Sequence, residues 1–511
     1  MLRLFPHLFP GFVFSGILIG VSAAAFGGVS RLAVDHAYVD DLAAGLAAKR
    51  YEPPRYDMPK RFRDLTPEEF AQIRFRPDAA LWRDEGLPFQ IQFDHLGDRR
   101  REPKQLFEFT DTHVQRIPFA RRFFDYGTLD PAFWATWHLE YAGFRVLYPF
   151  GDSNGFEEAA AFLDGTRLRA IARGQIFGAS VRALVTKGGE EEADEPPPAF
   201  VRFWLGKPAA AADAFTVHAL LDGPAVTGAY TFVIRPGEDT TMDVQASLHF
   251  RRKVAELGLA PISGMFWFGE GSATRFGDYR PEVHTVDGLL FAPEAARRVW
   301  RPLLNPAKPQ RTTFETPALA GFGLLQRDRD YRSYEDPDTG FERRPGVWVE
   351  TLGAWPAGRI CLVEEPTAEE AHDNVMVYWM PAAPVAPDRP LELSWRLHWS
   401  NVPRFGGPAG WVGATRQTVQ DGAPGRTKFV VDFDPASMAG VAAGSEVTVA
   451  AEAAAPGRLV GQHLARNDLD GSWRLTLRVA AAPGSEPVDL RARLYLSGRP
   501  VTETWAFRWM P

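Results

Sequence analysis

The sequence predicts an all-β protein built of sandwiches or barrels, with an immunoglobulin-like sandwich at its C-terminal end. Short runs that alternate between apolar and polar residues recur along the chain, and Gly, Pro and Asp turns separate them. The 511 residues include 46 Gly, 42 Pro, 37 Phe and 15 Trp, a composition that favours aromatic-rich sheets with many turns. No glycine-rich nucleotide-binding motif follows a predicted strand, so the sequence gives no support to βαβ units.

Composition and charge exclude several classes of protein. Hydrophobic residues make up 45% and charged residues 24% of the chain, which is typical of a globular protein rather than a disordered or collagen-like one. The net charge of -7 lacks the basic excess of nucleic-acid binders. The one cysteine, Cys361, can form neither an intramolecular disulfide nor a cysteine-based metal cluster, and its apolar neighbours favour a buried position.

The first residues have the pattern of a targeting segment. Arg3 precedes an apolar stretch over 12–21, and small residues follow at 22–25. This order predicts a cleaved secretory signal peptide over residues 1–25 and an exported protein without stable membrane insertion. The apolar run is shorter than the roughly 20 residues of a spanning helix, although an uncleaved anchor is the alternative.

Two helices are predicted before the sheets begin. Residues 39–49 carry acids at the start of a helical apolar pattern. Thr66 is followed by Pro67 and by Glu69 three positions on, which predicts a capped helix start. The clearest alternating strands are expected at 89–93, 217–221, 230–234 and 475–479.

A proline-rich stretch predicts the boundary between the two domains. Residues 381–390 contain four prolines and three alanines, the composition of a stiff linker. We therefore expect a large domain over 26–384 and an immunoglobulin-like domain over 385–511. The charged, proline-ended stretch 187–198 predicts a solvated surface loop.

Three stretches combine aromatic side chains with carboxylates and arginines, at 265–289, 323–331 and 364–379. A sugar-binding cleft needs this combination, since aromatic rings pack on pyranose faces and charged groups bond the hydroxyls. Glycoside cleavage usually requires two carboxylates, one of them kept protonated as an acid. Surface loops and core aromatics are the plainer explanation of the same pattern. The scattered histidines indicate no metal site, and no cofactor is expected.

Several long stretches match, in order, the motifs of a known family. They lie at 142–149, 173–178, 219–224, 228–232, 278–284, 300–303, 321–327, 364–379 and 502–505. With them, almost the whole mature chain resembles the periplasmic glucan biosynthesis protein G/D family (OpgG/OpgD, MdoG). The resemblance implies a galactose-mutarotase-like β-supersandwich and an immunoglobulin-like domain. It also implies a periplasmic role in making osmoregulated periplasmic glucans, through an anomer-inverting glycosidase-type enzyme that acts on β-1,2-glucan.

The resemblance assigns candidate site residues one by one. Asp373 matches the acid carboxylate of the family, and Glu370 is a second acid close to it. Thr285 stands where the family has its second carboxylate, and Phe341 where it usually has a tyrosine. The side chains expected to contact the glucan are Trp267, Arg280, Glu282, His284, Phe341, Arg344 and Trp379.

These departures from the family pattern leave three interpretations open. In the first, the chain is a glucan hydrolase with a substitute base, for which Asp287 is the nearest candidate because residues two apart in a strand share a face. In the second, it is a transglycosylase, in which a sugar hydroxyl replaces water as the acceptor. In the third, it binds glucan without catalysis. The loss of a base at Thr285 favours transfer, and a homodimer is compatible with the resemblance.

Overall fold

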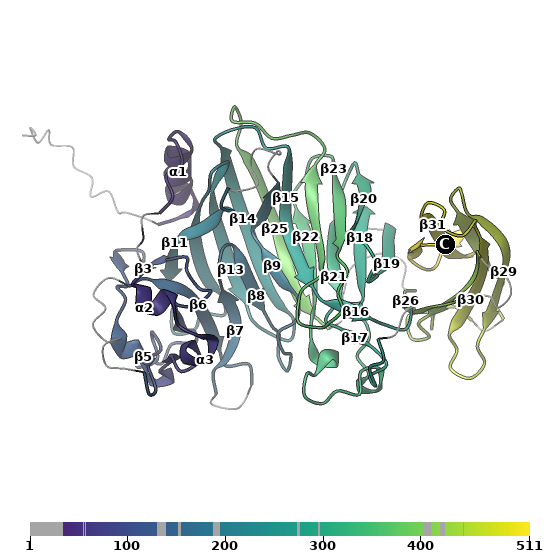
Figure 1. The fold of residues 1–511 in the computed structure, drawn as a ribbon, viewed down its shortest axis with the longest axis horizontal. Helices are drawn as coiled ribbons and strands as arrows, with labels where there is room; N and C mark the ends of the chain where they lie inside the picture. Colours follow the sequence, from purple (N-terminus) through teal and green to yellow (C-terminus); the bar gives the residue numbers. More distant parts are fainter. Residues whose placement is uncertain are drawn as a thin grey trace, which may run out of the picture.

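The computed structural model describes residues 34–54, 56, 58–129, 139–151, 155–187, 195–272, 276–294, 297–401, 410–419, 425–442 and 444–511. These residues form strands almost throughout, which confirms the prediction of an all-β sandwich protein. Figure 1 shows the large sandwich and, at its right, the smaller C-terminal one. The predicted signal peptide over 1–25 and most of the predicted loop at 187–198 lie outside the described residues.

The larger of the two main sheets runs through both domains, with fifteen strands among the described residues. In spatial order they are β28 (Val447–Ala453), β31 (Val488–Leu496), β33 (Thr504–Trp509), β19 (Arg297–Pro302), β18 (Gly288–Glu294), β21 (Gly321–Leu325), β22 (Gly346–Leu352), β25 (Leu391–Ser400), β14 (Thr240–Phe250), β13 (Val226–Arg235), β12 (Phe215–Asp222), β11 (Ala199–Gly206), β3 (Gln105–Phe109) and β4 (Val114–Arg116). A short strand, β32 (Arg499–Pro500), pairs with β31.

The second sheet packs against the larger one and has ten strands among the described residues. In spatial order they are β2 (Gln90–His95), β6 (Tyr141–Tyr148), β7 (Glu157–Phe162), β8 (Arg167–Ala170), β9 (Ser180–Arg182), β15 (Glu256–Gly264), β24 (Val375–Pro381), β23 (Gly358–Glu364) and β20 (Gln310–Thr316), and β10 (Leu184–Lys187) pairs with β15. All of these pairs are antiparallel, and four of them join strands that are consecutive in the chain: β6 with β7, β7 with β8, β8 with β9, and β23 with β24.

The C-terminal sandwich packs β28, β31 and β33 against a separate sheet. That sheet contains β26 (Val412–Val419), β27 (Arg426–Phe433), β30 (Trp473–Ala480) and β29 (Arg458–Arg466). Smaller pairs are β1 (Arg74–Phe75) with β5 (Phe124–Asp125) and β16 (Phe266–Phe268) with β17 (Val283–His284). β16 and β17 lie at the lower edge of the large sandwich, next to β26 (Figure 1).

Aromatic side chains from both main sheets meet in the core between them. Phe144 stacks on Phe162 with their ring centroids 4.8 Å apart, and Phe162 meets Phe232 of the larger sheet at 5.2 Å. These rings are buried, and burying one such side chain stabilises the fold by about 1.5–3 kcal/mol. The abundance of phenylalanine in the sequence is therefore explained by the packing of sheet on sheet.

The predicted helices are present with small shifts of their bounds. α1 (His36–Ala47) begins at the cap Asp35 and lies on the outer face of the larger sheet, where Val39 and Ala43 pack against Trp204. α2 (Lys60–Arg63) and α3 (Pro67–Phe70) are single turns. At α3 the capping box predicted from Thr66 is confirmed, because the side chains of Thr66 and Glu69 each accept the other's backbone N–H.

The domain boundary predicted at 384/385 is wrong. β25 follows the proline-rich stretch, yet it pairs with β14 on one side and β22 on the other, in the middle of the larger sheet. The large sandwich therefore continues to Ser400, and the C-terminal sandwich begins near Gly410. The prolines of 381–390 carry the chain from the second sheet to the larger one, rather than from one domain to the next.

The outer face of the second sheet carries the side chains that alternate with the core residues. Along β24, Val375, Val377 and Trp379 point into the core, because strand residues alternate between the two faces. Met376 and Tyr378 therefore lie on the opposite, outer face. No helix within the described parts of the chain is long and apolar enough to cross a membrane.

A cut between 381 and 390 should leave the two pieces of the chain bound to each other. β25, beyond the cut, is hydrogen-bonded between strands that precede it, and its Trp395 and Trp399 are buried. We expect a variant with a site-specific protease sequence between Pro387 and Asp388 to elute as the intact protein after cleavage. Release of the C-terminal piece without denaturant would contradict this topology, and the uncut variant is the control.

Candidate functional site

Asp373 stands two residues before β24, and its neighbour Asn374 fixes this position. The Asn374 Oδ1 accepts the backbone N–H of Phe266 at 2.8 Å. Its Nδ2 donates to the carbonyls of Phe266 and Glu365 at 3.0 and 2.9 Å. The side chain of one residue therefore holds the strand edge that carries Asp373 against β16.

Two cavities meet at Asp373 on the outer face of the second sheet, and together we call them the groove. One cavity, of about 270 Å³, has a mostly apolar lining with two glutamates, and its side chains include Val185, Val363, Met376, Tyr378, Glu256 and Glu365. The other, of about 230 Å³, is lined chiefly by ion-paired residues: Asp94, Arg100, Arg145, Asp164, Arg167 and Arg169. Asp373 thus separates an apolar arm from a charged arm.

The environment of Asp373 suits a proton donor. The pKa of its carboxyl is raised, chiefly because the surrounding protein desolvates it. Among the groups that lower this pKa are the charges of Arg167 and Arg182 and the hydroxyl of Ser180. The Ser180 Oγ lies 3.5 Å from the Asp373 Oδ2. Asp373 is nonetheless an exposed residue, so the geometry is that of a carboxyl on the floor of an open groove.

Arg280 draws three carboxylates together beside the groove. Its guanidinium donates to Asp278 at 2.8 and 2.9 Å, to Asp336 at 2.8 Å and to Glu370 at 2.7 Å. The Glu370 side chain is 40% exposed and ion-paired with Arg280. The Glu370 Oε2 is thus already engaged as a hydrogen-bond acceptor.

Arg344 connects this ionic cluster to Asp373. Its guanidinium donates to the carbonyls of Phe177 and Thr339, both at 3.1 Å. Desolvation lowers its pKa, and the negative charges of Glu370, Asp336 and Asp373 oppose this shift. Gly178 permits this arrangement, since a Cβ there would lie 2.9 Å from the Cβ of Arg344.

The hydroxyl of Thr285 is engaged with the backbone. Its Oγ1 accepts the backbone N–H of Met265 at 2.9 Å and lies 3.4 Å from the Met265 carbonyl oxygen. The side chain is buried. Thr285 therefore joins the end of β17 to Met265, the residue before β16.

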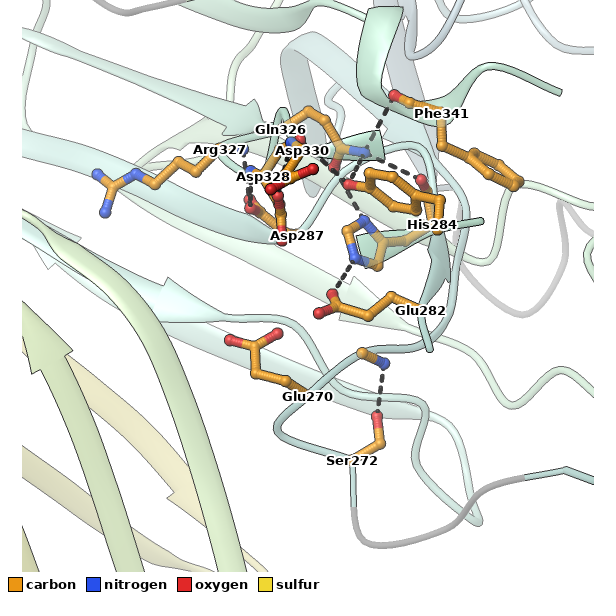
Figure 2. Close-up of polar contacts among 12 residues, drawn as sticks. Glu270, Ser272, Glu282, His284, Asp287, Gln326, Arg327, Asp328, Asp330 and Phe341 are labelled. Carbon is orange, nitrogen blue, oxygen red and sulfur yellow. Dashed lines mark hydrogen bonds and ion pairs between the residues drawn. The ribbon is translucent and has the colours of Figure 1, made fainter. Parts of the chain in front are cut away.

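Asp287, the predicted substitute base, has its carboxylate directed at a turn. Its Oδ2 accepts the backbone N–H groups of Arg327 and Asp328 at 2.8 and 3.3 Å (Figure 2). Burial raises its pKa to about 6, which is suitable for a base. However, Oδ1 is shielded from solvent and has no hydrogen-bond partner within the described structure. The base role stays a prediction, and the observed contacts are those of a turn-stabilising residue.

A buried polar chain lies behind the loops of the site. The His284 ring nitrogens lie 2.8 Å from Glu282 and 2.9 Å from Gln326, and Gln326 Nε2 donates to the Tyr334 hydroxyl at 2.6 Å (Figure 2). The carboxyls of Glu270 and Glu282 are hydrogen-bonded, and desolvation is the largest cause that raises the pKa of each to about 8. The pair therefore retains a proton at neutral pH.

Several residues expected to contact glucan are inside the protein instead. His284 and Trp379 are completely buried, Phe341 is 2% exposed and Glu282 is 7% exposed. The structure contradicts a direct sugar contact for these four side chains. Trp267 is half-buried and stacks on Phe276 at 5.2 Å. Arg280 and Arg344 lie next to the groove, but the terminal guanidinium nitrogens of both donate to protein groups.

The C-terminal sandwich supports the loops of the site directly. The Glu270 Oε1 accepts the backbone N–H of Thr415 at 2.9 Å, and Gln417 donates to the carbonyl of Gly271 at 2.8 Å. Arg327 forms a double contact with buried Glu503, at 2.6 and 3.0 Å. The smaller domain is thus part of the structure that positions the site.

Sequence reasoning missed the charged arm of the groove and Ser180. Arg167 and Arg169 alternate with apolar residues in β8, a pattern that predicts one polar face, but it does not reveal that this face borders Asp373. Glu270 was missed because nothing near it in sequence shows its partners Glu282 and Thr415. Within the described residues, no group of three or more His, Cys, Asp or Glu side chains is arranged to hold a metal ion.

Known proteins resemble this chain over nearly its full length. A model of the family described as "Periplasmic glucan biosynthesis protein, MdoG" matches residues 34–509. The "Glucans biosynthesis protein G" of Ralstonia nicotianae is 37% identical over 482 residues, which cover 92% of this chain and 95% of that protein. Proteins of the same name from Pseudomonas paraeruginosa and Dickeya dadantii are 36% and 34% identical over 503 residues, covering 96% of each chain.

Glu270→Gln should flatten the dependence of folding stability on pH. In the folded protein the pKa of Glu270 and Glu282 is raised to about 8, so the folded state holds a proton that the unfolded chain releases. This contribution to stability is complete below the unfolded pKa and is lost as the pH rises toward the folded one. We expect the urea midpoint of the wild type to fall between about pH 5 and pH 8, and that of Glu270→Gln to fall less.

The exposed Glu446→Gln serves as the matched control, because it removes a carboxylate without disturbing the buried pair. It should retain the full dependence on pH. Equal slopes in the wild type and both variants would show that the buried pair does not hold the proton.

Proposed function

The chain belongs to the periplasmic glucan biosynthesis protein MdoG family, and from this premise we propose that it is an anomer-inverting enzyme acting on β-1,2-glucan. We further propose that it transfers glucan chains to a sugar acceptor and that Asp373 is its general acid. The β-1,2 linkage and the inversion come from the family resemblance.

One observation carries the proposal: Asp373 is a desolvated carboxyl at the junction of two cavities in an open groove. Cleavage of a glycosidic bond needs a carboxylic acid beside the departing oxygen, with space for sugar on either side. The groove provides this space along the outer face of the second sheet. The paired arginines and aspartates of the charged arm offer donors and acceptors to sugar hydroxyls.

The proposed reaction balances as follows. Asp373 gives its proton to the glycosidic oxygen, and the bond between that oxygen and the anomeric carbon breaks. An acceptor oxygen bonds to the anomeric carbon from the opposite face, which inverts its configuration. The acceptor's proton passes to solvent, and Asp373 is reprotonated for the next cycle.

The contacts of Thr285 favour a sugar over water as the acceptor. A threonine hydroxyl bound to the Met265 backbone cannot remove a proton from water at neutral pH. A bound sugar hydroxyl has a high effective concentration at the reacting carbon, which reduces its dependence on a strong base. Transfer therefore tolerates the loss of the carboxylate better than hydrolysis does.

Two alternatives remain. In the first, the protein is a β-1,2-glucan hydrolase with Asp287 as its base, a role supported by the raised pKa of that residue but opposed by its contacts with the 327–328 turn. In the second, the protein binds glucan without cleaving it. Linear β-1,2-glucan separates all three: shorter reducing sugars indicate hydrolysis, re-linked or cyclic products indicate transfer, and bound but unchanged polymer indicates binding alone.

Asp373→Asn should reduce turnover of linear β-1,2-glucan by a factor on the order of 10²–10⁴. The amide keeps the shape of the side chain and removes the proton, so affinity for the polymer should stay close to that of the wild type. Product release is measured by chromatography, and binding by calorimetry. Glu369→Gln is the matched control, since Glu369 is a nearby exposed acid.

Full activity of Asp373→Asn would show that Asp373 is not the general acid, and Glu370 would be the next residue to test. Thr285→Asp is the companion variant. A carboxylate there should increase the share of reducing ends among the products if the missing base is what suppresses hydrolysis. An unchanged share would reject that explanation.

Export should remove the residues before about Phe26, following the signal-peptide pattern of 1–25. N-terminal sequencing of periplasmic protein should therefore begin near Phe26. Recovery of the uncleaved chain from membranes would favour an anchor instead.

A further inference from the structure

Exposed aromatic side chains are concentrated in one region of the described structure. Among its exposed large hydrophobic residues, the aromatic ones are Phe276, Tyr279 and Tyr331, with exposed fractions of 41%, 74% and 46%. All three lie in the loops that join β16 to β17 and β21 to β22. The remaining exposed members are the aliphatic or thioether residues Val419, Val460, Leu469 and Met510.

Hydrogen bonds fix the described turns that carry Tyr279 and Tyr331. Asp278 accepts the backbone N–H of Arg280 at 2.9 Å and also pairs with its guanidinium. Asp330 accepts the backbone N–H of Arg332 at 2.9 Å, and Asp336 accepts two further backbone N–H groups at 3.1 Å. Each turn is thus fixed by an aspartate that bonds the backbone a few residues on.

Tyr279 and Tyr331 both adjoin the ionic cluster around Arg280. The Arg280 guanidinium lies 5.9 Å from the centroid of the Tyr279 ring. It also bonds Asp336, which follows Tyr331 by five residues in the same loop. Asp336 accepts the backbone N–H of Thr339, the Thr339 carbonyl accepts a bond from Arg344, and Arg344 lies against Gly178 in the lining of the charged arm. This surface therefore continues from the groove.

We propose that Tyr279 and Tyr331 form a sugar-binding platform that holds glucose residues of the chain remote from the bond at Asp373. The inference rests on the proposed action on glucan. Phenol rings offer flat surfaces for the apolar faces of pyranose rings, and Asp278, Asp336 and Glu370 offer acceptors beside them for hydroxyl groups. An apolar protein surface covering the tyrosines would instead desolvate these carboxylates without giving them donors, which is costly.

The platform makes chain length the property that is recognised. A short oligosaccharide that fills only the groove leaves Tyr279 and Tyr331 empty, whereas a longer chain reaches both regions. Removal of a ring should therefore weaken the binding of long glucan chains and leave the binding of short ones unchanged. We expect each ring to contribute a factor of about 5 to 10 in affinity.

The test compares Tyr279→Ala, Tyr331→Ala and the double variant with Tyr279→Phe, which keeps the ring and removes the hydroxyl. Affinities for a long linear β-1,2-glucan and for a short oligosaccharide of the same linkage are measured by calorimetry on the full chain. The alanine variants should lose affinity for the long chain alone, and Tyr279→Phe should stay within about twofold of the wild type. Leu469→Ala, at an exposed residue of the C-terminal sandwich, is the surface control.

Unchanged affinity of the double variant for the long chain would overturn the platform. So would a change from dimer to monomer, measured by light scattering, with glucan binding unaffected, since the tyrosines would then form an interface between copies. If the wild type binds long glucan and the variants do not differ, only this inference fails. If the wild type binds neither ligand, the proposed function fails and the platform fails with it.

Discussion

The side-chain amide of Asn374 is the contact on which the arrangement of the site depends. It bonds both backbone groups of Phe266 and the carbonyl of Glu365, and so joins the edge of the second sheet to the loops below it. Asp373 precedes this residue, and Thr285 is attached to Met265, one position before Phe266. A single amide thereby sets the distance between the groove and the loops. Such buried polar contacts are effective because an unmade hydrogen bond there is expensive.

The second support comes from the C-terminal sandwich. Arg327 and Glu503 form a buried ion pair across the domain junction, and the Arg327 guanidinium lies 3.6 Å from the Trp300 ring centroid. Glu270 uses one carboxylate oxygen for Thr415 of the C-terminal sandwich and is hydrogen-bonded to Glu282 of the large one. A buried polar group that loses its hydrogen-bond partner is costly. The contacts of Glu270 and Arg327 with the C-terminal sandwich therefore hold the loops that carry these two residues.

Local sequence patterns predicted what depends on neighbours in the chain. Alternation located the strands, and the capping box at Thr66 and the placement of Asp373 at a strand edge follow from short-range rules. Alternation alone does not show which of the two faces of a strand meets the core. It therefore does not distinguish a sugar contact for Trp379 from the burial that the structure shows. Local patterns also could not assign β25, because the composition of 381–390 describes a stiff connection but not the strands that its continuation will pair with.

The continuous larger sheet has a consequence for how the molecule can move. β19 of the large sandwich pairs in parallel with β33 of the smaller one, through Val299 with Thr504 and Trp300 with Trp505. Rotation of one sandwich against the other would have to break this ladder, and few hinge motions in proteins break sheet hydrogen bonds of a packed core. The backbone of one continuous sheet therefore couples the two sandwiches, so a force applied to one is transmitted to the other through strand hydrogen bonds.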